Sequence, residues 1–220
     1  MSLTIRKATA DDKEFVIEAI VESETSGSDT VSYCAIFSID DHTFRKILSD
    51  IFDEEVGGQE LCIANFLIAE VEGERAAAIS AWIEKEEGLA SNIIKSNLFM
   101  HFMDRDVLLG ASANLALMNE INIQREDHAL QIECVYTAEK FRGRGLVKQL
   151  INEHIAQKQK DGAGFSKVQI VLMKNNASAI RSYEKAGFAI VAEKQCANDK
   201  IFSLLGCDTK ILMEKSIALI

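Results

Sequence analysis

The stretch LQIECVYTAEKFRGRGLVKQLI, from Leu130 to Ile151, decides the fold of this chain. Its first residues are β-branched, aromatic and apolar, which is typical of a strand. Two glycines, Gly143 and Gly145, follow in a short arginine-containing loop, where backbone N–H groups can turn toward a ligand. Apolar residues at helical spacing come next: Leu146, Leu150, Ile151 and Ile155. Because the first turn of a helix has unpaired N–H groups and a positive dipole end, the stretch predicts an anion site.

The composition describes an ordinary globular chain. It has 220 residues, 48% hydrophobic and 26% charged, and a net charge of −10 that argues against nucleic acid as a partner. The cysteine count is odd and no CxxC pair occurs, so we expect free thiols in a reducing compartment and no metal site. Without a long apolar run or a targeting segment, we expect a cytoplasmic protein that does not bind membranes.

Periodicity and turn residues predict the flanking elements. The expected strands and apolar runs are 3–8, 61–71, 76–83, 131–137, 167–173, 188–192 and 210–214, with a hairpin turn at 72–75. Helices are expected after caps at Thr9–Asp12, at Asp40, Asp41 or Thr43, and at Asn175 or Asn176, the last one ending at Gly187. Ser23 to Ser32 is expected to be a loop. Residues 85–127 are expected to form a helical insertion on the sheet of a single domain spanning 1–220.

Two motifs resemble those of the GNAT-type N-acetyltransferase superfamily. The first begins at Arg142 and continues through Gly145, like the family's Arg/Gln-x-x-Gly-x-Gly/Ala signature. The second runs from Asn176 through Tyr183 to Gly187-Phe188. The chain departs from the family where Val147 stands at a Gly/Ala position and where Tyr136-Thr137 replaces a frequent His-Pro. A Rossmann fingerprint fails because Lys148 takes its third glycine position, and no Gly-Lys-Ser/Thr of a Walker loop follows.

The resemblance implies an α/β (α+β) fold whose mixed, mostly antiparallel sheet of about six to seven strands is flanked by helices. A splayed parallel pair, Gln131–Thr137 and Lys167–Met173, would hold acetyl-CoA. The residues implied in cofactor binding are Val135, Tyr136, Thr137, Arg142, Gly143, Arg144, Gly145, Leu146, Val147, Lys148 and Asn176. A solvated glycine-rich turn is the alternative interpretation of the loop alone.

The resemblance also implies catalytic roles. Tyr183 matches the general acid that protonates the leaving thiolate, although a core aromatic beside Phe188 is the alternative. Glu133 is the candidate base, and strand alternation predicts it on the face opposite Ile132 and Cys134. Glu84, Asp127 and His128 are weaker candidates for the base; His42, His101 and His154 are expected at the surface or in packing. Cys134 is expected in the core, because no histidine partner for an acyl-cysteine is evident.

Three functions remain in competition. The first is acetyl transfer from acetyl-CoA to an amine by direct attack in a ternary complex. Its acceptor would be a small amine held between the Ser23–Ser32 loop, the helix from His42 and the insertion, with a protein amine left open. The second is a catalytically weak acyl-CoA-binding or sensing module, and the third is a nucleic-acid binder centred on Arg142 and Arg144, which the net charge disfavours. The closing strands and the insertion are both candidates for a homodimer contact.

Overall fold

The computed structural model describes residues 2–25, 30–86 and 88–218. Its strands are β1 Leu3–Lys7, β2 Phe66–Val71, β3 Glu74–Ile83, β4 Leu130–Thr137, β5 Lys167–Met173, β6 Ala189–Gln195 and β7 Thr209–Ser216. Its α-helices are α1 Lys13–Glu24, α2 Ser32–Phe37, α3 Asp41–Asp53, α4 Ser91–Phe102, α5 Arg105–Gly110, α6 Ser112–Glu120, α7 Leu146–Lys160, α8 Ala177–Lys185 and α9 Ile201–Leu205. Short 3₁₀ turns are η1 Ala10–Asp12, η2 Ile63–Asn65 and η3 Glu139–Phe141.

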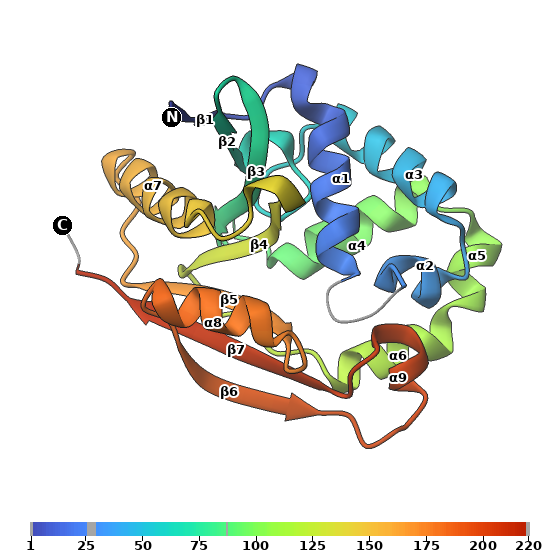
Figure 1. Ribbon diagram of the computed structural model, residues 1–220. Helices are drawn as coiled ribbons and strands as arrows, with labels where there is room; N and C mark the ends of the chain where they lie inside the picture. The colour runs from blue at the N-terminus through green and yellow to red at the C-terminus, as the bar shows by residue number, and fades with distance from the viewer. Residues whose placement is uncertain (1, 26–29, 87, 219–220) are drawn as a thin grey trace.

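One mixed sheet organises the described residues, with strand order β1-β2-β3-β4-β5-β7-β6. Every neighbouring pair in this order is antiparallel except β4 and β5, which are parallel. Figure 1 shows β4 and β5 close together at one end and separating toward the other. The predicted α/β fold with a mostly antiparallel sheet and one parallel pair is therefore confirmed.

Both faces of the central strands are covered, which explains their continuous apolar runs. In β2, Phe66 and Ile68 belong to a core cluster with the buried residues of α1 and α3. Leu67 and Ala69 alternate with them and belong to a second cluster with the buried residues of α7 and α8. The functional elements therefore lie between two hydrophobic layers, with β4 in contact with α1 and with α7.

Several local predictions are confirmed at their caps and turns. The Asp40 carboxylate accepts a hydrogen bond from Thr43 N at 2.7 Å and begins α3. The β2–β3 hairpin turns at Glu72 and Gly73, whose φ values of 53° and 83° fit the positive-φ turn that strand twist favours. The apolar run at 61–71 is strand only from Phe66 onward, because η2 interrupts it.

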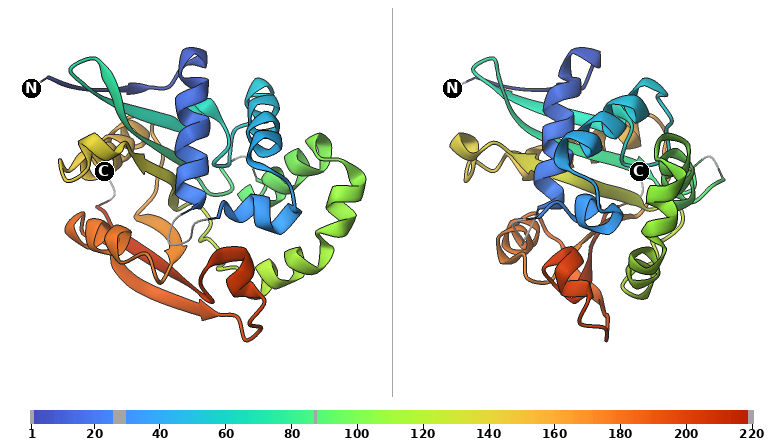
Figure 2. Two further views of the ribbon diagram at one scale, coloured as in Figure 1. Left: turned by 45° about the vertical axis from the view of Figure 1, so that its right-hand side comes forward. Right: turned by 90° about the vertical axis from the view of Figure 1, so that its right-hand side faces the viewer.

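The segment between β3 and β4 holds three helices, α4, α5 and α6. Figure 2 shows them as an arc that ends beside α9, a helix that the sequence did not suggest. The loop expected at 23–32 is shorter than predicted, because α1 continues to Glu24 and α2 begins at Ser32; residues 26–29 lie outside the described residues. No helix in the described part of the chain is long and apolar enough to span a bilayer.

Candidate active site

The parallel strands β4 and β5 pair over three positions and then part. Leu130 lies opposite Val168, and the last pair joins Ile132 to Ile170. No further pairing between the two strands occurs in the described chain, although β4 continues to Thr137 and remains paired with β3. The second half of β4 therefore presents one backbone edge with no strand beside it, and an extended ligand can pair with such an edge.

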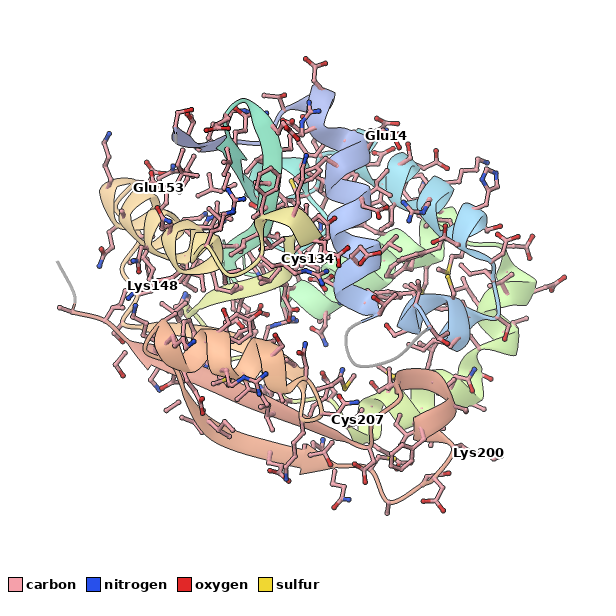
Figure 3. All side chains as sticks on the ribbon, in the orientation of Figure 1. Glu14, Cys134, Lys148, Glu153, Lys200 and Cys207 are labelled. Atoms are coloured by element: carbon pink, nitrogen blue, oxygen red, sulfur yellow. The ribbon has the colours of Figure 1, made fainter. Side chains whose placement is uncertain are left out.

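A β-bulge interrupts β4 within this free half. Cys134 has a φ of 51°, and the register with β3 shifts by one residue between Ala78 and Ser80. Ile132 lies in the core cluster with α7, whereas Cys134 lies in the cluster with α1, where Figure 3 shows it in the interior. The prediction that Ile132 and Cys134 share one face of the sheet, opposite Glu133, is therefore wrong. The bulge at Cys134 breaks the two-residue alternation of the strand.

The glycine loop leads directly into α7. Gly143 and Gly145 have φ values of 77° and 73°, and Gly145 is the residue that caps the helix. A Cβ added at either glycine would meet no atom within 4 Å, so the space in front of the loop is open. The first hydrogen bond of the helix runs from Gln149 N to Gly145 O at 3.3 Å, which leaves the preceding N–H groups directed outward. This turn fits the diphosphate of a nucleotide cofactor.

The basic side chains of the loop help to hold it in place. Arg142 Nε donates to Thr137 O at 3.2 Å, which ties the loop to the end of β4. Arg144 Nη2 donates to Lys140 O at 3.2 Å, and its guanidinium lies 5.2 Å from the centre of the Phe141 ring. The groups of this loop that could meet an anion are therefore mainly its backbone N–H groups, together with Lys148 at the exposed start of α7 (Figure 3).

Val147, the departure from the glycine or alanine of the signature, packs against the core cluster beneath α7. Leu146 beside it is buried in the same cluster. The bulk of Val147 is thus directed partly into the protein, while its N–H group stays in the first turn of the helix, where it has no intrahelical partner.

Tyr183 is positioned by the helix that Asn176 begins. The Asn176 side chain accepts from Ala179 N at 3.1 Å, as an N-cap does. The Tyr183 ring is 5% exposed and lies 6.1 Å from the ring of Phe188. Burial raises the pKa of Tyr183 above its ordinary value, and the charge of Glu133 raises it further. The hydroxyl therefore stays protonated near neutral pH and lies within the electrostatic range of Glu133.

Glu133 is tied to an arginine that the sequence did not single out. Arg125 Nη2 donates to Glu133 Oε1 at 2.5 Å, and the same guanidinium lies 5.1 Å from the centre of the Trp82 ring. Burial raises the pKa of Glu133, and the charge of Arg125 only partly opposes this rise. A carboxylate whose pKa is raised is a stronger base than an exposed one.

A second ion pair lies near Glu133 and was also missed. Glu60 precedes η2 and binds Lys95 of α4, and the side chain of Glu60 is 6% exposed. Burial alone would raise the pKa of Glu60, but Lys95 and Arg125 hold the pKa below its ordinary value. Glu60 Oε2 and Arg125 Nε are buried without a hydrogen-bond partner among the described residues. No periodicity or motif marks Glu60 or Lys95 in the sequence.

The weaker candidates for the base have structural partners. The Glu84 carboxylate accepts from Trp82 Nε1 at 3.2 Å and from Ser91 N at 2.9 Å, and Asp127 pairs with Lys85 at 2.9 Å. His128 is an exposed turn residue with a φ of 62°.

The three remaining histidines lie where packing or surface roles were expected. His42 and His101 are exposed, and His154 is buried with Nε2 3.0 Å from Ile79 O. Burial lowers the pKa of His154 to about 4, so it is neutral near neutral pH. Cys134 is buried as predicted, and burial raises its pKa well above the ordinary value, which disfavours a thiolate nucleophile.

Comparisons with known proteins agree with this geometry. The family model described as "Acetyltransferase (GNAT) family" matches residues 33–188. Among solved structures, an N-acetyltransferase from Staphylococcus aureus Mu50 is similar with a TM-score of 0.67 and 14% identity, covering 96% of this chain and 99% of that one. The ribosomal-protein-S18-alanine N-acetyltransferase from Escherichia coli has a TM-score of 0.51 and 14% identity, covering 100% and 96%.

A third similar structure is a mutant agmatine N-acetyltransferase in its apo form, with a TM-score of 0.58 and 11% identity. It covers 99% of this chain and 100% of that one. A search of curated proteins found no significant match. At these identities the structural likeness shows the fold, whereas the family model covers well over half of the chain. The chain therefore belongs to the acetyltransferase (GNAT) family and is an acetyltransferase.

Proposed function

We propose that this protein transfers an acetyl group from acetyl-CoA to a primary amine by direct attack in a ternary complex. The observation that carries the proposal is the parting of β4 and β5 directly before the glycine loop of α7. We further propose that residues 1–220 act as one cytoplasmic domain with residues 85–127 as a helical insertion. Solved relatives are named for agmatine and for a ribosomal-protein alanine, so the fold alone does not choose the amine.

The free edge of β4 offers backbone groups of Val135 and Thr137 to the pantetheine arm, on either side of Tyr136, whose own backbone groups face Ala78 of β3. The diphosphate would be bound by the backbone N–H groups of the loop and first helical turn, Arg142, Gly143, Arg144, Gly145, Leu146, Val147 and Lys148. Thr137 supports this assignment, because its hydroxyl is buried and has no partner among the described residues. Asn176 caps α8 and is assigned a secondary contact with the cofactor.

Glu133 and Tyr183 supply the proton transfers in this proposal. Glu133, directly or through a water molecule, accepts the proton that the amine must lose before it attacks the thioester carbonyl. The new C–N bond forms as the C–S bond breaks, and Tyr183 donates its proton to the departing thiolate. The N–H group of Val135 lies on the free edge and is assigned to the developing oxyanion.

A pair of measurements tests the proposal. Release of free thiol from acetyl-CoA is followed across amines, amino acids, polyamines and peptides, and coenzyme A binding is measured separately by calorimetry. The proposal expects binding together with acetylation of at least one class of amine. Binding without any thiol release would instead support the acyl-CoA-binding module, and no binding of coenzyme A would defeat both.

A further inference from the structure

The chain segment between β3 and β4 leaves the sheet and returns to it at one point. Glu84, the residue after β3, donates its N–H to Ala129 O at 3.0 Å, and its carbonyl accepts from His128 N at 2.9 Å. The helices α4, α5 and α6 lie between these two ends of the segment. The two ends are therefore joined beside the start of β4, the strand that carries Glu133.

A series of side-chain contacts fixes an arginine at this point. The Glu84 carboxylate accepts from Trp82 Nε1 at 3.2 Å and from Ser91 N at 2.9 Å, and all three residues are buried. Arg125 contacts two of them. Its Nη1 donates to Ser91 Oγ at 3.3 Å, and its guanidinium lies 5.1 Å from the centre of the Trp82 ring. The guanidinium is therefore held by a ring and a hydroxyl whose positions Glu84 sets.

The other arm of the guanidinium reaches Glu133. Arg125 Nη2 donates to Glu133 Oε1 at 2.5 Å, and the two side chains are 16% and 23% exposed. The second carboxylate oxygen, Oε2, accepts no hydrogen bond from the described residues and is not among the buried atoms that lack a partner. One oxygen of the carboxylate is thus held, while the other is free to take a proton.

We propose that Arg125 is the positioning residue of Glu133, and that the segment between β3 and β4 holds Arg125 in place for this purpose. This inference rests on the proposed role of Glu133 as the base. The planar fork of the guanidinium binds Ser91 with one arm and Glu133 with the other, which orients the carboxylate with Oε2 toward the acceptor amine. A base held in one orientation meets its proton more often than a freely rotating one.

The charge of Arg125 also affects the protonation of Glu133. Burial raises the pKa of Glu133, and Arg125 opposes this rise more strongly than Lys95 does, whereas Glu60 adds to it. The other titratable groups of the described chain on which the charge of Glu133 acts are Cys134, Tyr183 and Lys210. Removing the charge of Arg125 should therefore raise the pKa of Glu133 further, so that the carboxylate becomes protonated at a higher pH.

The first experiment separates charge from orientation. Arg125→Gln removes the charge, and the acidic limb of its kcat/KM profile is expected to move up by about one pH unit or more. Arg125→Lys keeps the charge without the fork, so its acidic limb should stay in place while kcat on the plateau falls by roughly ten- to a hundredfold. Equal coenzyme A affinity by calorimetry shows that the variants are folded. An unmoved acidic limb in Arg125→Gln would overturn the inference and leave the acetyl transfer intact.

The second experiment changes the support of the arginine. Ser91→Ala removes the hydroxyl that Arg125 binds but keeps the N–H that Glu84 accepts, so kcat is expected to fall by roughly three- to tenfold with the acidic limb unmoved. Arg105→Gln is the matched control, because Arg105 is an exposed arginine of the same segment, on α5, and should change neither quantity. Unmodified kcat values in both Ser91→Ala and Arg125→Lys would refute the orienting role.

A double variant distinguishes failure of this inference from failure of the proposed function. Glu133→Gln already lacks the proposed base, so adding Arg125→Gln should move the remaining pH profile no further. A shift of equal size in the Glu133→Gln background would show that Arg125 acts through another group and would overturn the inference, although acetyl transfer continues. Binding of coenzyme A without thiol release by the unmodified protein would instead defeat the proposed function, and the positioning role with it.

Discussion

Gln131 and Gln169 face each other across β4 and β5, one position before the strands part, and Gln131 Nε2 donates to Gln169 Oε1 at 3.0 Å. Both side chains are buried. Gln169 also accepts from Glu126 N and donates to the Glu214 carboxylate. This amide pair joins the two halves of the sheet one position before β4 and β5 part.

We predict that Gln169→Leu lowers the free energy of unfolding by about 2–3 kcal/mol, because it leaves the buried amide of Gln131 and the N–H of Glu126 without this hydrogen-bond partner. Gln131→Leu should cost less, since Gln169 keeps its other partners. The double variant should be more stable than the sum of the two changes predicts, because both partners are then apolar. Urea unfolding of the three variants measures this, and strict additivity would contradict the pairing.

Tyr183→Phe should lower kcat by roughly 10²-fold or more, as loss of a general acid does. Coenzyme A affinity should be unchanged, because the ring and its packing beside Phe188 remain. Steady-state kinetics and calorimetry on the same preparation separate the two effects. Full activity in the Phe variant would make Tyr183 a core aromatic without a catalytic role.

Gly145→Ala should weaken coenzyme A binding by about tenfold or more, because a Cβ at positive φ costs about 1–2 kcal/mol and enters the space in front of the loop. Gly73→Ala is the matched control, since Gly73 also has a positive φ and open surroundings but lies in the β2–β3 turn. Calorimetric titration with coenzyme A should distinguish them. Equal losses in both variants would point to general destabilisation.

Glu133→Gln should lower kcat/KM by roughly 10²-fold at neutral pH and remove the acidic limb of the pH profile. In the unmodified protein, activity should fall as pH decreases through the raised pKa of Glu133, because the protonated carboxyl cannot accept a proton. Glu14→Gln, an exposed substitution on α1, is the control (Figure 3). An acidic limb that survives in Glu133→Gln would assign the base to another group.

His154 should make stability depend on pH. Its pKa is about 4 in the folded protein and near 6.5 in the unfolded chain, so the unfolded state binds the proton first as pH falls. The free energy of unfolding should be fully retained above about pH 6.5 and fall by about 3 kcal/mol toward pH 4.

His154→Gln, whose amide can still donate to Ile79 O, should flatten this component of the pH profile. His42→Gln, at an exposed position, should leave it in place. The quantity to compare is the difference in unfolding free energy between each variant and the unmodified protein, since the carboxylates titrate in the same range. A pH-independent difference for His154→Gln would contradict the assignment.

Local features of the site could be predicted from the sequence because neighbours along the chain make them. Gly143 and Gly145 permit positive φ wherever the loop lies, and Asn176 caps a helix through an N–H three residues ahead. Alternating burial on two faces likewise follows from runs of apolar residues. The motif spacing between Arg142 and Tyr183 was enough to indicate the family.

The bulge at Cys134 and the ion pairs of Glu60 and Glu133 depended on tertiary structure. A bulge is a mismatch of register between two strands, here β3 and β4, and the residue types in β4 do not reveal it. Glu60, Lys95 and Arg125 are charged residues that the sequence pattern alone would assign to the surface. They meet because segments far apart in the chain fold onto one opening, and only that meeting gives a buried charge its partner or leaves it without one.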